Sequence, residues 1–279
     1  MIRSSIARAV SRPVTRPVNG AKLSFEIVMK KLFANGEQGF FYDPNDLTTM
    51  FQDAAGTVPV TGAGQAVGLI KDKSGRGNHA RQTNSTSRPL LQRNATTGAY
   101  YLAFDGVDDF LQTNNIDFTS TNEMSLFVAV RIIYTSDKEA YQVVMELSGD
   151  AGVNNGSFVL TTPHGAVSSL QYGSRGTMRS NNIFSGITAE QRVITAKSKI
   201  SSNLNNVRVS GGVYNNVSTA QGTGNYGNYP LYIGRRGGTS LSFSGHIYSL
   251  IGIGRLTTDA ETIALEKSIA KNTGVTLNV

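Results

Sequence analysis

The chain has 279 residues, 39% of them hydrophobic, which is enough to bury a sizeable core in one large domain or two small ones. It contains no cysteine, which excludes disulfides, zinc–thiolate sites and thiol nucleophiles. No apolar run reaches the ~18 residues that a transmembrane helix requires, so we expect no membrane span.

The net charge of +7 is concentrated at the N-terminus. Residues 1–31 carry seven basic side chains against Glu26 alone, while the rest of the chain is close to neutral. This asymmetry predicts an arm that meets an acidic surface, such as nucleic acid, a membrane or an acidic protein. A solvated tail without a partner is the alternative interpretation.

Residues 1–36 are predicted to form a basic arm and a helix that anchor the protein. Residues 1–10 show helical apolar spacing, but Pro13 and Pro17 end any helix and favour an extended strap. We expect an acidic surface of a partner protein to bind four arginines of the arm: Arg3, Arg8, Arg12 and Arg16.

A short helix is predicted over residues 21–34, where Phe25, Val28, Met29 and Leu32 follow helical spacing before Asn35 and Gly36. Its apolar face is wide for so short a helix. It packs either on the main domain or on a partner and other copies of the chain. In the second case Phe25 and Leu32 contact the partner.

Residues 37–279 read as one domain, and from residue 98 on short apolar strands recur between Gly, Asn and Ser turns. The expected strands cover residues 125–134, 141–147, 157–162, 169–172, 192–200, 206–214, 230–234 and 243–254. This pattern predicts a β-sandwich or barrel. Thr258 and Glu261 form a capping box that predicts one C-terminal helix, ending at Asn272 and Gly274.

Four motifs in this order resemble a concanavalin A-like lectin/glucanase sandwich of the laminin G-like type. They are DKSGRGNHA at 72–80, FDGVDDFL at 104–111, LYIG at 231–234 and FSGHIY at 243–248. With YDP at 42–44 and LTTMFQD at 47–53, the set is similar to a form found in tailed-phage virion proteins. The resemblance covers about residues 40–279. It implies an all-β, two-sheet antiparallel jelly-roll with an N-terminal arm and helix and one C-terminal helix.

The acidic residues do not match the glucanase branch of that family, which places its acids on one strand as Glu-x-Asp-x-x-Glu. No such run exists, and Glu139 and Glu146 lie too far apart to match it, so we expect no enzyme. Asp105, Asp108 and Asp109 cluster at a turn, which we interpret as structural. A calcium ion held through Asp105 and Asp108 is the alternative, and no other cofactor is expected.

Sugar binding generally uses aromatic faces beside polar donors and acceptors. Tryptophan is absent, so tyrosines in or near Gly/Asn loops are the candidates, with Arg235 close by. The candidate tyrosines are Tyr172, Tyr214, Tyr226 and Tyr229. Arg175, Arg179 and Arg236 are also close in sequence to these loops. Ordinary exposed loop composition is the competing interpretation.

From these observations and the resemblance we expect a structural virion protein of a tailed phage, anchored by its arm as a capsid decoration, head fibre or tail-attached protein. Its partners are other virion proteins and its own copies, most simply in a trimer, and nucleic acid is not expected. A carbohydrate-binding adhesin that recognises host-surface glycans is the second hypothesis, and a glycoside hydrolase is the third.

Overall fold

A computed structural model describes residues 25–133, 137–165, 169–187 and 189–278. The helices are α1 (Phe25–Leu32) and α2 (Asp259–Thr273), with 3-10 turns at Leu47–Thr49, Ser85–Ser87 and Ile200–Ser202. The strands of the first sheet, sheet A, are β1 (Gly39–Tyr42), β5 (Leu90–Arg93), β6 (Tyr100–Asp105), β8 (Glu123–Ile132), β13 (Arg192–Lys199), β14 (Leu204–Val209), β15 (Asn215–Val217) and β17 (Ser244–Ile253). The strands of sheet B are β2 (Met50–Phe51), β3 (Leu69–Ile70), β4 (Ala80–Arg81), β7 (Leu111–Asp117), β9 (Tyr141–Leu147), β10 (Ser157–His164), β11 (Ser169–Arg175), β12 (Arg179–Ser185) and β16 (Asn228–Ile233).

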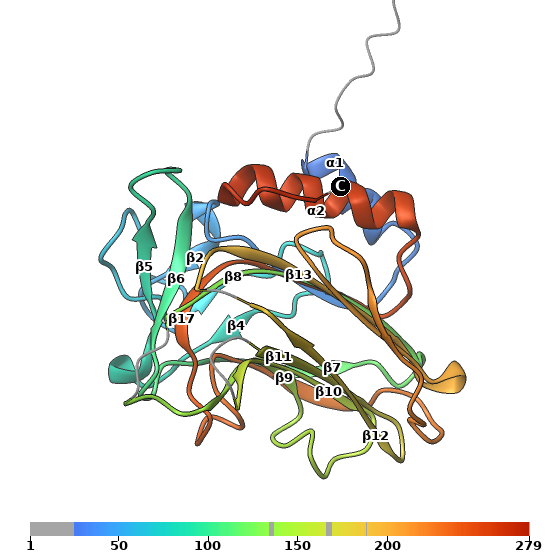
Figure 1. Cartoon of the computed structure of the whole chain (residues 1–279). Helices are drawn as coiled ribbons and strands as arrows, with labels where there is room; N and C mark the ends of the chain where they lie inside the picture. Colours follow the sequence, from blue (N-terminus) through green and yellow to red (C-terminus); the bar gives the residue numbers. More distant parts are fainter. Residues whose placement is uncertain (1–24, 134–136, 166–168, 188, 279) are drawn as a thin grey trace, which may run out of the picture.

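These elements form three layers, with the two helices above sheet A and sheet B below it (Figure 1). Sheet A runs β15-β14-β13-β8-β17-β6-β5, with β1 on β17, and sheet B runs β12-β11-β10-β9-β16-β7-β4-β3-β2. The described strand pairs are antiparallel. The predicted all-β, two-sheet antiparallel sandwich is confirmed.

Strand β8 shows why the layers stack in this order. Leu126 and Val128 face the core between the sheets, while Phe127 and Ala129 face the helices. Successive side chains of a strand point to opposite faces, so a strand that is buried on both faces is apolar throughout. The apolar run that predicted this strand therefore also indicates that a further layer covers the outer face of sheet A.

Helix α2 begins as the sequence predicted. The Thr258 side chain accepts a hydrogen bond from the Glu261 amide, and the Glu261 carboxylate accepts one from the Thr258 amide. Gly274 ends the helix in the left-handed conformation, with φ of 75°. Leu265 and Ile269 are buried against the outer face of sheet A, so the helix completes a second apolar core.

Helix α1 packs beside α2 rather than standing free. Met29, Leu32 and Phe33 are buried in the core under the helices. Leu32 is only 1% exposed, because its side chain packs inside the domain. The prediction that it contacts a partner is therefore wrong. The Phe25 side chain and the predicted arm residues Arg3, Arg8, Arg12 and Arg16 lie outside the described part of the chain.

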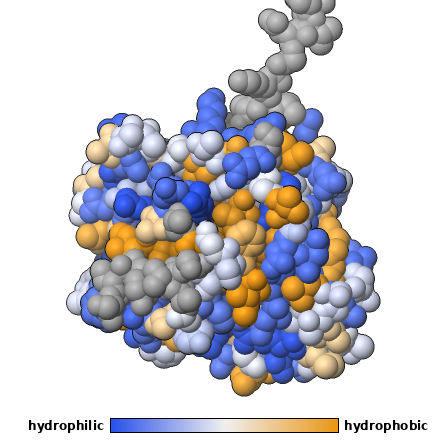
Figure 2. Space-filling model, in the orientation of Figure 1, coloured by the Kyte–Doolittle hydropathy of each residue, from blue (hydrophilic) through white to orange (hydrophobic). Residues whose placement is uncertain are grey.

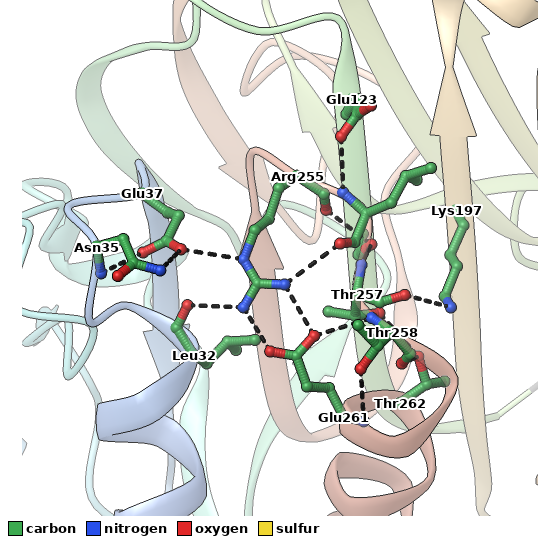
Figure 3. A network of polar contacts seen from close by, with 12 residues as sticks. Leu32, Asn35, Glu37, Glu123, Lys197, Arg255, Thr257, Thr258, Glu261 and Thr262 are labelled. Carbon is green, nitrogen blue, oxygen red and sulfur yellow. Dashed lines mark hydrogen bonds and ion pairs between the residues drawn. The ribbon is translucent and has the colours of Figure 1, made fainter.

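Arg255 ties the two helices together (Figure 3). Its guanidinium donates to the Leu32 carbonyl at 3.1 Å and to the Glu37 carboxylate at 3.1 Å, on the α1 side. On the α2 side it donates to both carboxylate oxygens of Glu261, at 2.9 and 2.7 Å. This pairing lowers the pKa of Glu261 to about 2. One arginine therefore fixes where the N-terminal helix enters the domain.

The surface offers no single large apolar face in the view of Figure 2, where hydrophobic side chains appear in patches between hydrophilic areas. The exposed large apolar side chains come from many elements: Ile27, Val58, Leu90, Val107, Ile133, Tyr141, Val153, Met178, Ile183 and Val213. Scattered apolar surface of this kind is ordinary and does not by itself mark a site. No helix among the described residues is long and apolar enough to cross a bilayer.

Candidate functional site

Two of the tyrosines predicted to bind glycans are buried. Tyr172 and Tyr226 are 0% and 1% exposed, and their hydroxyls join a polar network between the sheets. The Tyr172 hydroxyl lies 2.7 Å from Ser198 Oγ, and the Tyr226 hydroxyl lies 2.6 Å from the same atom and 2.7 Å from Ser174 Oγ. Neither ring has a face on which a sugar could stack, so these two predictions are wrong.

The other predicted glycan residues stay at the surface but apart from one another. Tyr214 follows β14 of sheet A, where the Arg208 guanidinium lies 4.7 Å from its ring. Tyr229 lies near the start of β16 in sheet B, and Arg235 lies two residues after its end. The Tyr229 hydroxyl donates to the Asn155 carbonyl at 3.1 Å, and Arg235 donates to the Thr239 carbonyl at 3.0 Å. The structure does not combine them into one site.

A different aromatic group lies on the outer face of sheet A. We call Tyr101, His246 and Tyr248 the aromatic shelf. The rings of Tyr101 and His246 are stacked, with centroids 3.9 Å apart, and Tyr248 lies 4.9 Å from Tyr101. Tyr101 and His246 come from neighbouring strands β6 and β17, whose register pairs Ala103 with His246. Tyr101 is partly exposed, so part of the shelf reaches solvent.

Polar side chains border this shelf around a shallow open pocket. The pocket is lined by Asn94, Arg131, Ala189, Glu190 and Gln191. Asn94 Nδ2 donates to the Tyr248 hydroxyl at 3.4 Å, and Arg131 Nε donates to the Ala189 carbonyl at 3.3 Å. These two bonds join the pocket to the shelf and to the loop before β13.

Two buried polar atoms at this place lack a partner within the described residues, namely His246 Nδ1 and Gln191 Nε2. A buried polar group without a hydrogen bond costs roughly 1–3 kcal/mol, so such groups are uncommon and need an explanation. Both atoms are therefore unpaired polar groups, one in the shelf and one on a residue that lines the pocket.

The shelf is largely uncharged at neutral pH. Burial, helped by the nearby Arg131 charge, lowers the pKa of His246 to about 4, so the imidazole is neutral. Burial also raises the pKa of Tyr101, which keeps its hydroxyl protonated. The Glu190 carboxylate is paired with Arg192 at 2.6 Å. The arrangement therefore presents neutral ring surface beside amide and guanidinium donors.

The acidic turn between β6 and β7 is built as the sequence suggested. Oxygen atoms of Asp105, Asp108 and Asp109 all lie within 4.8 Å of one another. Asp105 accepts a bond from the Val107 amide at 2.8 Å, and Asp109 accepts one from the Asp105 amide at 3.0 Å. Asp108 accepts a bond from Ser87 Oγ at 2.7 Å. These bonds stabilise a turn, and calcium at Asp105 and Asp108 stays a prediction.

The second family-like loop, residues 72–80, is also structural. The buried Asp72 carboxylate accepts bonds from the amides of Phe41, Ser74 and Asn78, at 2.9, 2.8 and 3.0 Å. His79 Nδ1 in turn accepts a hydrogen bond from the Asp72 amide at 3.0 Å. Asp72 therefore holds the loop against β1.

Comparisons with known proteins agree with this architecture. No family model matches the sequence, and neither does any curated protein. Solved structures do match. A botulinum neurotoxin type C structure, in work relating cell entry to interaction with two ganglioside molecules, has a TM-score of 0.57 at 11% identity and covers 86% of this chain and 53% of its own.

The receptor-binding domain of botulinum neurotoxin mosaic serotype C/D gives a TM-score of 0.55 at 10% identity, covering 84% of this chain and 51% of its own. The serotype D ligand-binding domain in complex with N-acetylneuraminic acid gives 0.54 at 11% identity, covering 86% and 52%. The chain therefore spans about half the length of these neighbours. Likeness at this identity establishes a shared β-sandwich fold.

The aromatic shelf itself was missed from the sequence. A signal was present, because Tyr101 and His246 occupy the face of their strands opposite to the buried Leu102 and Ile247. Finding it required knowing which face of each strand points outward and that β6 and β17, more than a hundred positions apart, are neighbours.

Proposed function

We propose that the protein binds carbohydrate at the aromatic shelf. The observation that carries the proposal is the partly exposed Tyr101 ring, stacked on His246 at 3.9 Å beside a pocket lined by amide, guanidinium and carboxylate side chains. Sugars present C–H faces that pack on aromatic rings and hydroxyls that need directional partners. The fold neighbours, described with N-acetylneuraminic acid and gangliosides, support this ligand class.

Glycan-array binding followed by calorimetry tests the proposal, using the full chain. Tyr101→Ala should weaken binding at least about tenfold, since stacking and pocket shape are lost together. Tyr141→Ala is the matched control, because Tyr141 also contacts a histidine ring, His164 at 4.8 Å, but on the other sheet. The proposal fails if the wild type binds no glycan, or if both variants lose binding equally.

A role in a phage particle is the second proposal, and the N-terminal charge favours it. Residues 1–24 contain five basic residues and no acidic one. Such a segment suits an acidic protein surface on a capsid or tail. The virion location, the virion partners and a trimeric assembly all belong to this proposal, together with the expectation that the protein is not an enzyme.

Deletion of residues 1–24 tests the anchor without touching α1, which is packed in the domain. Particles assembled with the shortened chain should lose the protein, while its glycan binding persists. Undiminished incorporation into particles would contradict the anchor. Release of sugars from any glycan bound on the array would contradict the non-enzymatic role.

A further inference from the structure

Two arginines face each other on the outer surface of sheet B. Arg175 and Arg179 are register partners in the β11–β12 hairpin. Like charges placed directly opposite on neighbouring strands destabilise a sheet. Within the described residues neither arginine forms an ion pair, since Arg175 donates to the Gly152 carbonyl at 2.9 Å and Arg179 Nε to Asn181 Oδ1 at 2.7 Å. The hairpin therefore places two positive charges side by side, and Glu146 and Asp150 attract Arg179 only at longer range, without an ion pair among the described residues.

Two glycines leave room for the Arg179 side chain. It lies across Gly173, where a Cβ atom would come within 2.9 Å of Nη2 and 3.1 Å of Nε. Nη1 lies 3.5 Å from the position of a Cβ on Gly152, in the loop that covers this face. Neither Nη1 nor Nη2 donates to an acceptor in the described part of the chain. The Nη1 and Nη2 groups of Arg179 are thus held in position, and their N–H donors have no acceptor among the described residues.

The neighbouring acids are already engaged. Glu146 is fully buried. Its two carboxylate oxygens accept hydrogen bonds from Arg236 Nε, at 3.2 and 3.0 Å, and one of them also accepts a bond from the Ala151 amide at 2.7 Å. Asp150 lies 3.6 Å from Arg236 Nη1. Three guanidiniums therefore share two carboxylates. Burial, then the charge of Arg236, lowers the pKa of Arg179, so an added negative charge would be favourable there.

We propose that Arg179, with Arg175 beside it, binds an oxyanion. A guanidinium presents parallel N–H donors that match the two oxygens of a carboxylate or sulfate. A sugar acid and a free inorganic anion both offer this chemistry. The site lies on the sheet opposite to the aromatic shelf and does not depend on it.

The probes are inorganic sulfate, methyl glucuronide and the neutral methyl glucoside, titrated into the full-length protein while the arginine Nε–H resonances are followed by NMR. Sulfate or glucuronide should shift the Arg179 resonance in a saturable way, and the glucoside should not. Saturation by glucuronide at lower concentration than by sulfate assigns the site to an acidic sugar, and the reverse order assigns it to an inorganic anion. Either order supports the oxyanion site.

Arg179→Gln should weaken anion binding at least tenfold. Arg179→Lys keeps the positive charge, and it should also weaken binding because the planar fork is lost. Arg81→Gln, an exposed arginine on β4 of the same sheet, is the matched control. Tyr101→Ala should leave anion binding unchanged, so failure of the shelf and failure of this site are separable. No saturable shift in the wild type, or equal weakening by Arg81→Gln, would overturn the proposal.

Discussion

At the scale of single residues, Asp109 shows how the acidic turn affects stability. It is 7% exposed, and burial, then the charges of Asp105 and Asp108, raise its pKa to about 7. The folded pKa therefore lies above the unfolded value of about 3.9. Its contribution to stability is complete below about pH 4 and is lost as the pH rises through 7.

The side chain of Asp109→Asn does not ionise, so the variant should not lose stability as the pH rises. Its free energy of unfolding should therefore increase relative to that of the wild type between pH 4 and pH 8. The gain is at most about 4 kcal/mol for a shift of roughly three pKa units. Urea unfolding at pH 4, 6 and 8 measures it, with the exposed Asp117→Asn as control. A difference between Asp109→Asn and wild type that does not change with pH would contradict this account.

The same unfolding series tests the predicted calcium ion. A divalent cation on Asp105 and Asp108 would favour ionised carboxylates at the turn and bind only the folded chain. Calcium chloride should then raise the stability of the wild type at pH 8. If Asp105→Asn and the wild type respond identically to calcium, the turn is structural only.

The face of the strand to which each side chain points was the property of single residues that the sequence predicted least well. The loops near Tyr172 and Tyr226 have the composition of a binding surface, yet both rings point between the sheets. A shift of one residue in register moves every side chain of a strand to the other face. Register depends on partners distant in sequence, so aromatic composition alone could not separate these rings from Tyr101.

At the scale of elements, Arg255 should govern how firmly α1 is held. Arg255→Ala removes its bonds to Leu32, Glu37 and Glu261 together. We expect a loss of about 1–3 kcal/mol, because each bond to an ionised group contributes more than a neutral one. Hydrogen exchange should quicken in α1 well before it changes in the strands of sheet A.

Arg88→Ala is the control for that measurement, since Arg88 bonds only to loop carbonyls of Gln82 and Thr83 among the described residues. Unchanged protection of α1 in Arg255→Ala would show that apolar packing alone holds the helix. Uniform loss of protection across both sheets would show that Arg255 supports the whole domain and not the helix.

Elements with strong local signals were predicted well. The strand expected at 141–147 is confirmed as β9, and the capping box of α2 is confirmed. The strand expected at 206–214 ends earlier, at Val209, because Ser210 and Gly211 adopt positive φ of 48° and 75°. Strand β12 was missed because its sequence, RSNNIFS, is mostly polar, as suits a strand at the edge of a sheet.

At the scale of the whole molecule, the described domain should fold without the arm. Deleting residues 1–24 should change the free energy of unfolding by no more than about 0.5 kcal/mol, because the described core is built from residues of α1 and of the chain after it. Deleting 1–36 should cost several kcal/mol, because it removes the buried side chains of Met29, Leu32 and Phe33. Equal stability of the two deletions would contradict the placement of α1.

The two-sheet antiparallel architecture followed from regular strand spacing and the family resemblance, whereas the candidate site did not. The shelf forms only when β6 and β17 become neighbours and the loop before β13 folds over Arg131. Those contacts are properties of the assembled sandwich, and no local motif encodes them.

Mapping a bound glycan on the protein tests the central claim most directly. A glycan selected on an array is titrated into isotope-labelled protein, and the amide shifts are followed. The account predicts that the largest shifts cluster at Tyr101, Arg131, Gln191 and His246 on the outer face of sheet A. Shifts centred on Tyr214 or Tyr229, or on sheet B for a neutral glycan, would contradict it.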